Sequence, residues 1–288
     1  MGLEFPHRVG IAAGLDKNAK ALRFMRNMGF GFVEVGTVTP LPQPGNPKPR
    51  LFRLTRNQAL INRMGFNNPG VIEMAKQLKQ RPSGLIVGGN IGKNTLTPND
   101  RAVEDYAVCF ERLYPYVDYI AVNVSCPNIR ELRDLQNRKD LETILLRLLE
   151  IRSQMKERKP VVLKLSPDLT DEQLDETIEV VRNCGIDGII ATNTTTRRDN
   201  LDYTPEEINW FGSGGLSGPP LRQLSTDMIR KLRNRLGTDF PIIGSGGILS
   251  SCDALEKIEA GADLVQLYTG FIYEGPGILT QLLKALKD

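Results

Sequence analysis

Three asparagines and one lysine occupy positions where a hydrophobic core normally contains apolar side chains. Asn90, Asn123 and Asn193 end short apolar runs, and Lys164 lies inside another, Val161–Leu165. A buried unpaired amide costs about 1–3 kcal/mol, and an isolated buried ammonium costs more. Each asparagine alone is more often a loop cap than a ligand, but together they favour a binding site. Amides offer donors and acceptors, so the pattern suits a planar ligand with imide and carbonyl edges, and Lys164 requires an anionic partner.

Glycine-rich segments add a second kind of chemistry, the binding of an anion by backbone N–H groups. Segment 244–247 follows one apolar run, 268–270 follows the next, and 214–218 precedes both. In α/β barrels the phosphate site usually follows the last two strands. Tight turns are the alternative explanation for these glycines. No GxGxxG motif follows the first apolar run, which argues against a dinucleotide.

Cys126 is the candidate reactive group. Cysteines are more often buried packing residues than catalysts, but Pro127 stiffens this loop and Asn123 and Asn128 flank the thiol. Ser125 is the competitor; neighbouring side chains on an extended backbone point in different directions, so at most one of the two faces a ligand. The other cysteines lie in or beside predicted helices and are interpreted as structural: Cys109, Cys184 and Cys252.

The elements that must position these groups alternate regularly along the chain. Short runs that are apolar almost throughout are typical of parallel strands buried on both faces. The predicted strands are 9–13, 32–36, 85–89, 119–124, 161–165, 188–192, 241–244 and 264–268. The predicted helices are 19–28, 69–79, 100–113, 141–156, 171–182, 221–235, 251–260 and 277–286. Eight strand–helix units predict a (β/α)8 TIM barrel, with an open doubly wound sheet as the alternative.

The polar groups then fall at the carboxyl ends of the strands, which form the active-site face of such a barrel. Two long connections leave the same face, the proline-rich segment 40–68 and the segment 193–220. Connections longer than about 15 residues are usually functional or disordered. Thr170 and Ser250 are expected to cap the starts of helices, and Gly29 and Gly185 their ends.

Composition limits the remaining possibilities. The 288 residues, 40% hydrophobic and 25% charged, predict one barrel domain over 1–288, and a net charge of +3 gives no nucleic-acid footprint. Four cysteines without a CxxC pair predict free thiols, and His7, the single histidine, cannot support a histidine-based metal site, so no metal is expected. The chain shows no signal peptide and no apolar run of about 18 residues. As given, it is expected to be soluble and cytoplasmic.

A series of motifs, in order over nearly the whole chain, resembles the dihydroorotate dehydrogenase family. These are Ala13-Gly-Leu-Asp-Lys17, Gly36-Thr-Val-Thr-Pro40, Pro44-Gly-Asn46, Pro49-Arg-Leu-Phe-Arg53, Asn62-Arg-Met-Gly-Phe-Asn-Asn68, Asn90-Ile-Gly-Lys-Asn94, Ala191-Thr-Asn-Thr-Thr195, Gly214-Gly-Leu-Ser-Gly218 and Gly244-Ser-Gly-Gly247. The resemblance implies oxidation of dihydroorotate to orotate in de novo pyrimidine synthesis, with hydride transfer to FMN.

The resemblance also implies residue roles. The FMN contacts fall on Ala13, Gly14, Leu15, Asp16, Lys17, Thr37, Asn90, Asn123, Lys164, Thr192, Gly218, Gly247, Tyr268 and Thr269. The substrate contacts fall on Lys17, Asn62, Arg63, Met64, Gly65, Phe66, Asn123, Asn128, Asn193 and Thr194. The base falls on Cys126, which as a thiolate would take the acidic proton of dihydroorotate, while Lys164 would balance the charge of the reduced flavin.

Segments 42–46 and 62–66 resemble the membrane-associated, quinone-reducing class of the family, and two features depart from it. That class usually has serine at the base position, where Cys126 resembles the soluble class. It also has an N-terminal helical segment that touches the membrane, which is missing here. Either the chain is trimmed, and the longer form is peripheral on the cytoplasmic side of the cell membrane, or it uses a soluble acceptor such as fumarate.

Two hypotheses from other classes remain at this point. A phosphate-binding isomerase or aldolase on the same barrel could use Lys164 to form a Schiff base. A non-catalytic barrel could act as an interaction scaffold, which would leave Lys164 and the asparagines unexplained. A flavin spectrum would distinguish the oxidoreductase from both.

Overall fold

A computed structural model describes residues 1–125 and 135–286 of the chain. Its central strands are β1 (Val9–Ile11), β2 (Phe32–Val38), β5 (Ile86–Ile91), β6 (Tyr119–Asn123), β7 (Val161–Leu165), β8 (Gly188–Ala191), β10 (Ile242–Ser245) and β11 (Leu264–Leu267). They pair in parallel and close into a barrel in the order β1-β11-β10-β8-β7-β6-β5-β2. The predicted (β/α)8 barrel is confirmed, and the open sheet was the wrong alternative.

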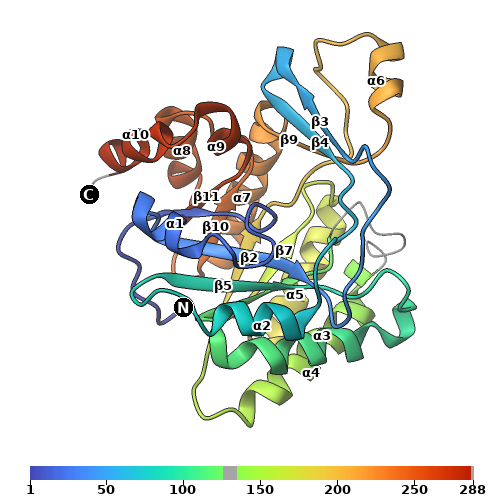
Figure 1. Ribbon diagram of the computed structural model, residues 1–288, viewed down its shortest axis with the longest axis vertical. Helices are drawn as coiled ribbons and strands as arrows, with labels where there is room; N and C mark the ends of the chain where they lie inside the picture. The colour runs from blue at the N-terminus through green and yellow to red at the C-terminus, as the bar shows by residue number, and fades with distance from the viewer. Residues whose placement is uncertain (126–134, 287–288) are drawn as a thin grey trace.

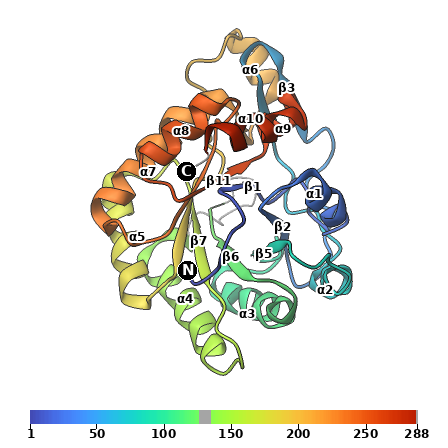
Figure 2. The same ribbon diagram turned by 90° about the vertical axis from the view of Figure 1, so that its left-hand side faces the viewer.

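Helices surround the barrel, as Figure 2 shows in a view close to its axis. They are α1 (Leu22–Met28), α2 (Val71–Leu78), α3 (Ala102–Leu113), α4 (Arg138–Ser153), α5 (Asp171–Cys184), α7 (Arg222–Leu236), α8 (Ser251–Glu259) and α10 (Gly277–Ala285). The side chains of Thr170 and Ser250 cap α5 and α8, and Gly29 and Gly185 end α1 and α5 in the left-handed conformation. All four capping predictions are confirmed.

Helix α1 begins three residues later than predicted, for a local reason. The Asp16 carboxylate accepts hydrogen bonds from the backbone N–H groups of Lys20 (2.9 Å) and Ala21 (2.8 Å). Ala19, which lies between Asp16 and these two donors in the sequence, has a φ of 56°. The chain therefore makes a tight turn before the helix can start. Two short helices were not predicted, α6 (Pro205–Phe211) and α9 (Thr269–Glu274).

The barrel strands separate two layers of apolar side chains, because alternate residues of a strand face opposite sides. One cluster fills the barrel interior and consists of Phe32, Tyr119, Ala121, Val162, Ile190, Ile243 and Leu264. The residues of opposite parity, such as Val33 and Ile120, join the larger core beneath the helices. Further along β2, β7 and β11, two residues after the members of this cluster, the side chains that face the barrel interior are polar. They are Glu34, Lys164 and Gln266. The barrel is thus apolar at one end and polar at the other.

The two long connections are ordered rather than irregular. The strands β3 (Leu51–Leu54), β4 (Ala59–Asn62) and β9 (Gly215–Ser217) form an antiparallel sheet that joins them. Arg56 pairs with Glu207 of α6 at 2.8 Å. Figure 1 shows β3, β4 and α6 rising together above the barrel. The two connections, segments 40–68 and 193–220, are together called the excursion. The excursion covers the carboxyl ends of the barrel strands.

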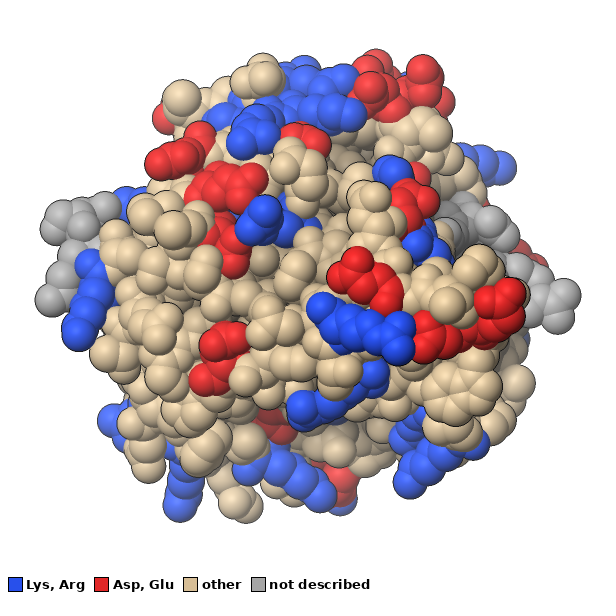
Figure 3. All heavy atoms as spheres, turned by 90° about the horizontal axis from the view of Figure 1, so that it is seen from above, with Lys and Arg blue, Asp and Glu red and all other residues tan. Residues whose placement is uncertain are grey.

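The described surface and helices bear on possible partners. Seen from the side of the excursion, Lys and Arg are interspersed with Asp and Glu rather than gathered in one basic surface (Figure 3). No helix in the described part of the chain combines the length and the apolar character that crossing a bilayer requires.

Candidate active site

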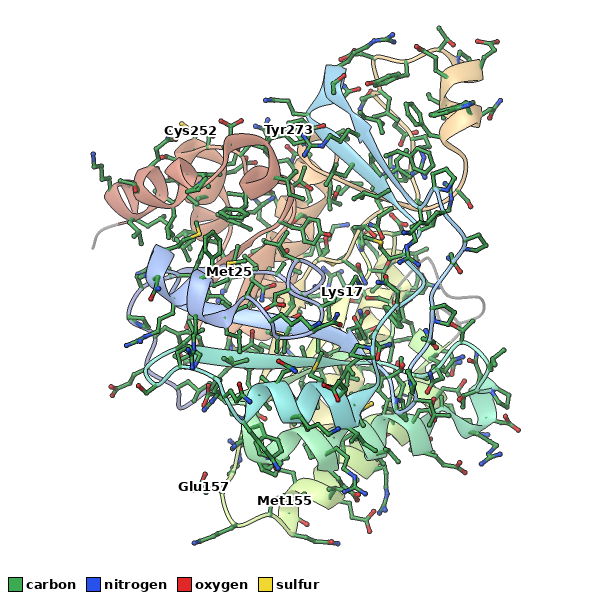
Figure 4. The ribbon with its side chains drawn as sticks, viewed as in Figure 1. Lys17, Met25, Met155, Glu157, Cys252 and Tyr273 are labelled. Carbon is green, nitrogen blue, oxygen red and sulfur yellow. The ribbon has the colours of Figure 1, made fainter. Side chains whose placement is uncertain are left out.

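A cavity opens at the carboxyl ends of the barrel strands, under the excursion. Most of the residues singled out from the sequence line it: Ala13, Gly14, Lys17, Thr37, Asn62, Met64, Gly65, Phe66, Asn123, Lys164, Thr192, Asn193, Thr194, Gly218, Gly247, Tyr268 and Thr269. Figure 4 shows Lys17 near the centre of the molecule and Cys252 on the outer helical layer. Residues far apart in the sequence thus meet around one space.

Four of the predicted site residues do not line the cavity. Leu15 packs against the main core, and Asp16 holds the turn before α1. The Arg63 guanidinium donates to the carbonyl oxygens of Phe211 (2.6 Å) and Ser213 and so ties β4 to α6. Asn90 is fully buried behind the cavity wall. The remaining predicted residues, Cys126 and Asn128, lie outside the described residues.

Sequence reasoning missed several lining residues. They are Ala12, Ser217, Leu221, Ser245, Gly246, Ile248, Gln266 and Gly270. Four of them stand inside the glycine-rich segments singled out from the sequence, although none had been given a contact by number: Ser217, Ser245, Gly246 and Gly270. Gln266 is the informative omission, because a glutamine inside the apolar run Leu264–Leu267 is as anomalous as Lys164 in its strand.

A chain of hydrogen bonds holds the amides in fixed orientations. The Thr37 hydroxyl donates to Asn90 Oδ1 at 2.5 Å and accepts from Asn123 Nδ2 at 3.0 Å. Asn193 Nδ2 donates to Asn123 Oδ1 at 3.2 Å. The network joins β2, β5, β6 and the segment after β8. Because each member constrains the next, the cavity wall presents its polar groups without a ligand to order them.

Ser125 belongs to this network rather than to the cavity. Its side chain is fully buried, donates to the Lys164 carbonyl oxygen at 2.9 Å, and accepts from Asn193 Nδ2 at 3.1 Å. The Ser125 hydroxyl therefore orients the Asn193 amide, and it does not face a ligand in the cavity.

The floor of the cavity contains the acidic partner that Lys164 requires. Lys164 Nζ lies 3.7 Å from Glu34 Oε1, and both side chains are almost completely buried. The Glu34 carboxylate also accepts from Asn90 Nδ2 (2.8 Å), Gln266 Nε2 (3.0 Å) and the Tyr119 hydroxyl (3.2 Å). Burial, and after it the neighbouring Glu34, raise the pKa of Tyr119 well above its ordinary value, so the phenol remains a donor.

Gln266 provides a test of whether the cavity is built for a ligand. Its Nε2 group is committed to Glu34, while its buried Oε1 accepts no hydrogen bond from the described residues. Gln266 also lines the cavity. A buried acceptor without a partner costs free energy unless a ligand or water supplies the donor. The floor therefore offers a cation at Lys164 and an open acceptor at Gln266.

The glycine segments shape the other end of the cavity. Gly247 has a φ of 75°, and a Cβ there would lie 2.4 Å from the Cα of Arg222. A Cβ on Gly270 would lie 2.0 Å from the carbonyl oxygen of Ile248. Only glycine permits this approach. Leu221, the N-cap of α7, also lines the cavity, so the positive end of a 15-residue helix dipole faces it.

Helix α8 holds the first turn of α7 in place beside these glycines. Burial opposes the ionisation of Asp253, but hydrogen bonds from Arg222, the Leu249 N–H and the Ser250 hydroxyl keep the pKa of the Asp253 carboxyl below its ordinary value. Lys257 donates to the Arg222 carbonyl oxygen (2.7 Å) and to Thr226 Oγ1 (2.5 Å), and burial lowers its pKa to about 7. Helix α8 thus fixes the first turn of α7 beside the glycine segments.

Comparison with known proteins agrees with this arrangement. The family model described as dihydroorotate dehydrogenase matches residues 1–288. The chain belongs to the dihydroorotate dehydrogenase family. The family predicted from the sequence motifs is therefore confirmed, and the match covers the described barrel together with its excursion.

Curated relatives and solved structures cover almost the whole chain. A dihydroorotate dehydrogenase (quinone) of Christiangramia forsetii is 53% identical over 281 residues, 98% of this chain and 81% of the relative. One of Paracidovorax citrulli is 49% identical over 306 residues, 99% of this chain and 84% of the relative. A crystal structure of DHODH from Eimeria tenella in complex with ferulenol superimposes with a TM-score of 0.92 at 38% identity, covering 99% of this chain and 81% of that one.

Proposed function

We propose that this chain oxidises dihydroorotate to orotate in pyrimidine biosynthesis, using FMN and passing the electrons to a quinone. The observation that carries the proposal is the cavity itself, where the amides of Asn123 and Asn193, the ammonium of Lys164 and the glycine segments surround one space. Family membership supports oxidation over the isomerase or aldolase alternative and over a non-catalytic scaffold.

The two ends of the cavity suit the two ends of FMN. Gly218, Gly246, Gly247 and Gly270 would hold the phosphate with their backbone N–H groups, beside the start of α7. The floor would hold the polar edge of the ring, with Lys164 as a donor and Gln266 Oε1 as an acceptor. When bound, FMN supplies hydride acceptance from dihydroorotate and electron delivery to a second acceptor.

The substrate would lie against the remaining wall. Lys17 offers a cation for the carboxylate of dihydroorotate, and Asn62, Asn193 and Thr194 offer polar groups for its ring. Met64, Gly65 and Phe66 would close the wall from the excursion. Arg63 acts indirectly, because its guanidinium is bound to the carbonyl oxygens of Phe211 and Ser213. The role of Asn128 rests on the family resemblance alone.

The proposed base is Cys126, also from the resemblance. The described neighbour Ser125 supports this choice, because its hydroxyl is fully buried and bonded to Lys164 O and Asn193. Cys126 would take the acidic C–H proton next to a carbonyl of dihydroorotate, while the amides hold the pyrimidine ring in position.

The proposed acceptor rests on the relatives, which are named dihydroorotate dehydrogenase (quinone) and are identical to this chain at about half of the aligned positions. A soluble acceptor such as fumarate is the alternative, favoured by a cysteine at the base position. Rates with a soluble quinone and with fumarate, measured on the same preparation, decide between them. Peripheral contact with a membrane and a cytoplasmic location remain predictions.

The cofactor released by acid from the purified protein is expected to co-migrate with FMN on chromatography. Gly247→Ala should weaken FMN binding about tenfold or more, because the new Cβ meets the Arg222 backbone in the proposed phosphate site. Gly277→Ala is the matched control, since a Cβ there meets nothing within 4 Å. Release of FAD, or equal FMN binding by both variants, would contradict the cofactor proposal.

A further inference from the structure

A buried carboxylate inside a barrel needs an explanation, and neither hydride transfer nor proton abstraction uses Glu34. The residue is fully buried on β2, does not line the cavity, and contacts four other strands through its side chain. Placing an ion there is costly unless its partners are well arranged. A well-packed apolar residue would stabilise the barrel as well or better. Its presence therefore points to a role in the site above it.

The partners of Glu34 are arranged as those of a carboxylate. Asn90 Nδ2, Gln266 Nε2 and the Tyr119 hydroxyl all donate to it. A carboxylate that receives only donors is acting purely as an acceptor, as the charged form does. The fourth neighbour, Lys164 Nζ, lies at 3.7 Å, which is an ion-pair distance and too long for a hydrogen bond.

Lys164 therefore has one side toward Glu34 and another toward the cavity. Of the acidic side chains that the structure describes, Glu34 is the one that pairs with it. Among the residues that the structure describes, the other titratable groups around this space are Tyr119 below and Lys17 and Tyr268 in the wall. Burial raises the pKa of Tyr268 and, with Glu34, that of Tyr119, so both phenols stay neutral. No other described acid replaces Glu34 if it is removed.

We propose that Glu34 is a positioning residue that keeps Lys164 protonated and fixed at the cavity floor, so that negative charge arising on a bound flavin meets a cation already in place. This inference rests on the proposed FMN site. Glu34 would act through Lys164 and touch neither cofactor nor substrate. It would also fix the Gln266 amide, leaving its Oε1 as the open acceptor.

The proposal has a consequence for proton uptake. In the parent chain, reduction of the bound flavin would take two electrons and one proton, and the Lys164 ammonium would balance the remaining negative charge. In Glu34→Gln, Lys164 lacks its anionic partner and would release its proton to solvent while the flavin is oxidised. Reduction would then take two electrons and two protons, the second proton returning to Lys164 Nζ.

The substitution itself is geometrically mild. The new amide has the shape of the carboxylate, and its oxygen can still accept from Asn90 Nδ2. Its nitrogen would face the Gln266 Nε2 group, but Gln266 can turn over and present Oε1, which has no described donor in the parent. Tyr119→Phe is the matched control, because it removes a neutral hydrogen bond to Glu34 at 3.2 Å and no charge.

The test is the midpoint potential of the FMN-loaded chain against a reference dye, from about pH 7 to about pH 10. For a two-electron couple, each proton taken up contributes about 30 mV per pH unit. The parent, Tyr119→Phe and the double variant E34Q/K164M should show the one-proton slope. Glu34→Gln alone should approach twice that slope. A parent-like slope in Glu34→Gln overturns the inference while leaving the FMN proposal standing, whereas a parent chain that binds no FMN overturns both.

A second measurement needs no cofactor, and it applies even if the Glu34→Gln variant does not bind FMN. Lys164→Met leaves the Glu34 carboxylate buried without its counter-charge, which is strongly destabilising, whereas the double variant E34Q/K164M removes both charges. The double variant should unfold at a temperature roughly 5 °C or more above that of Lys164→Met. An equal or lower unfolding temperature would show that the two side chains are not coupled, and would overturn the inference.

Discussion

Replacing Cys126 with alanine is expected to slow the reduction of the bound flavin by dihydroorotate about 10²–10⁴-fold, the usual contribution of a positioned general base. Flavin binding should persist, because the proposed phosphate site is built from the segments around Gly247 and Gly270. The rate is measured by anaerobic stopped-flow absorbance at saturating dihydroorotate. Cys126→Ser should keep part of the activity with a higher pH optimum, since a hydroxyl is a weaker acid than a thiol.

Ser125→Ala is the control that separates the two neighbours. It removes the hydroxyl that orients Asn193 and anchors on Lys164 O, so a milder loss is expected, mainly in the affinity for dihydroorotate. The assignment fails if Cys126→Ala reduces its flavin at the parent rate while Ser125→Ala does not.

Replacing Lys164 with alanine is the second change with a large expected effect. It removes the cation from the cavity floor and leaves the buried Glu34 carboxylate uncompensated beneath the proposed ring site. Removing one preorganised donor that stabilises developing negative charge typically costs about 10²–10³-fold in rate. We therefore expect lower FMN occupancy and slower reduction, measured by the absorbance of the purified protein and by stopped-flow reduction after saturation with FMN.

Lys159→Ala is the matched lysine control. Its ammonium donates to the carbonyl oxygens of Tyr114 (2.7 Å) and Val117 (2.8 Å), ahead of β7 and away from the cavity. That variant should lose some stability and keep the parent rate of flavin reduction. Normal occupancy and normal reduction in Lys164→Ala would assign Lys164 another role.

The barrel was predictable because its pattern is local. Each buried strand appears as a short apolar run, and the caps at Thr170 and Gly185 depend on neighbouring residues alone. The sheet formed by β3, β4 and β9 was not predictable in the same way. It pairs Asn62 with Gly215, and no local pattern links segments so far apart.

The site was predictable where a residue contradicted its surroundings, as Lys164 does in its apolar strand. Its partner Glu34 was missed, although it is the same kind of anomaly in Phe32–Val38. Glu34 lies within its strand rather than at the strand's carboxyl end, so a search for polar residues at strand ends does not find it. Gln266 was missed for the same reason. The inner layer of the barrel therefore holds functional information that strand ends alone do not reveal.

The most direct test of the account follows the visible spectrum of the FMN-loaded chain under anaerobic conditions. Addition of dihydroorotate should bleach the flavin absorption and release orotate in equal amount, and a soluble quinone added next should restore the absorption. A flavin band that dihydroorotate leaves unchanged would contradict the proposed site and its chemistry together.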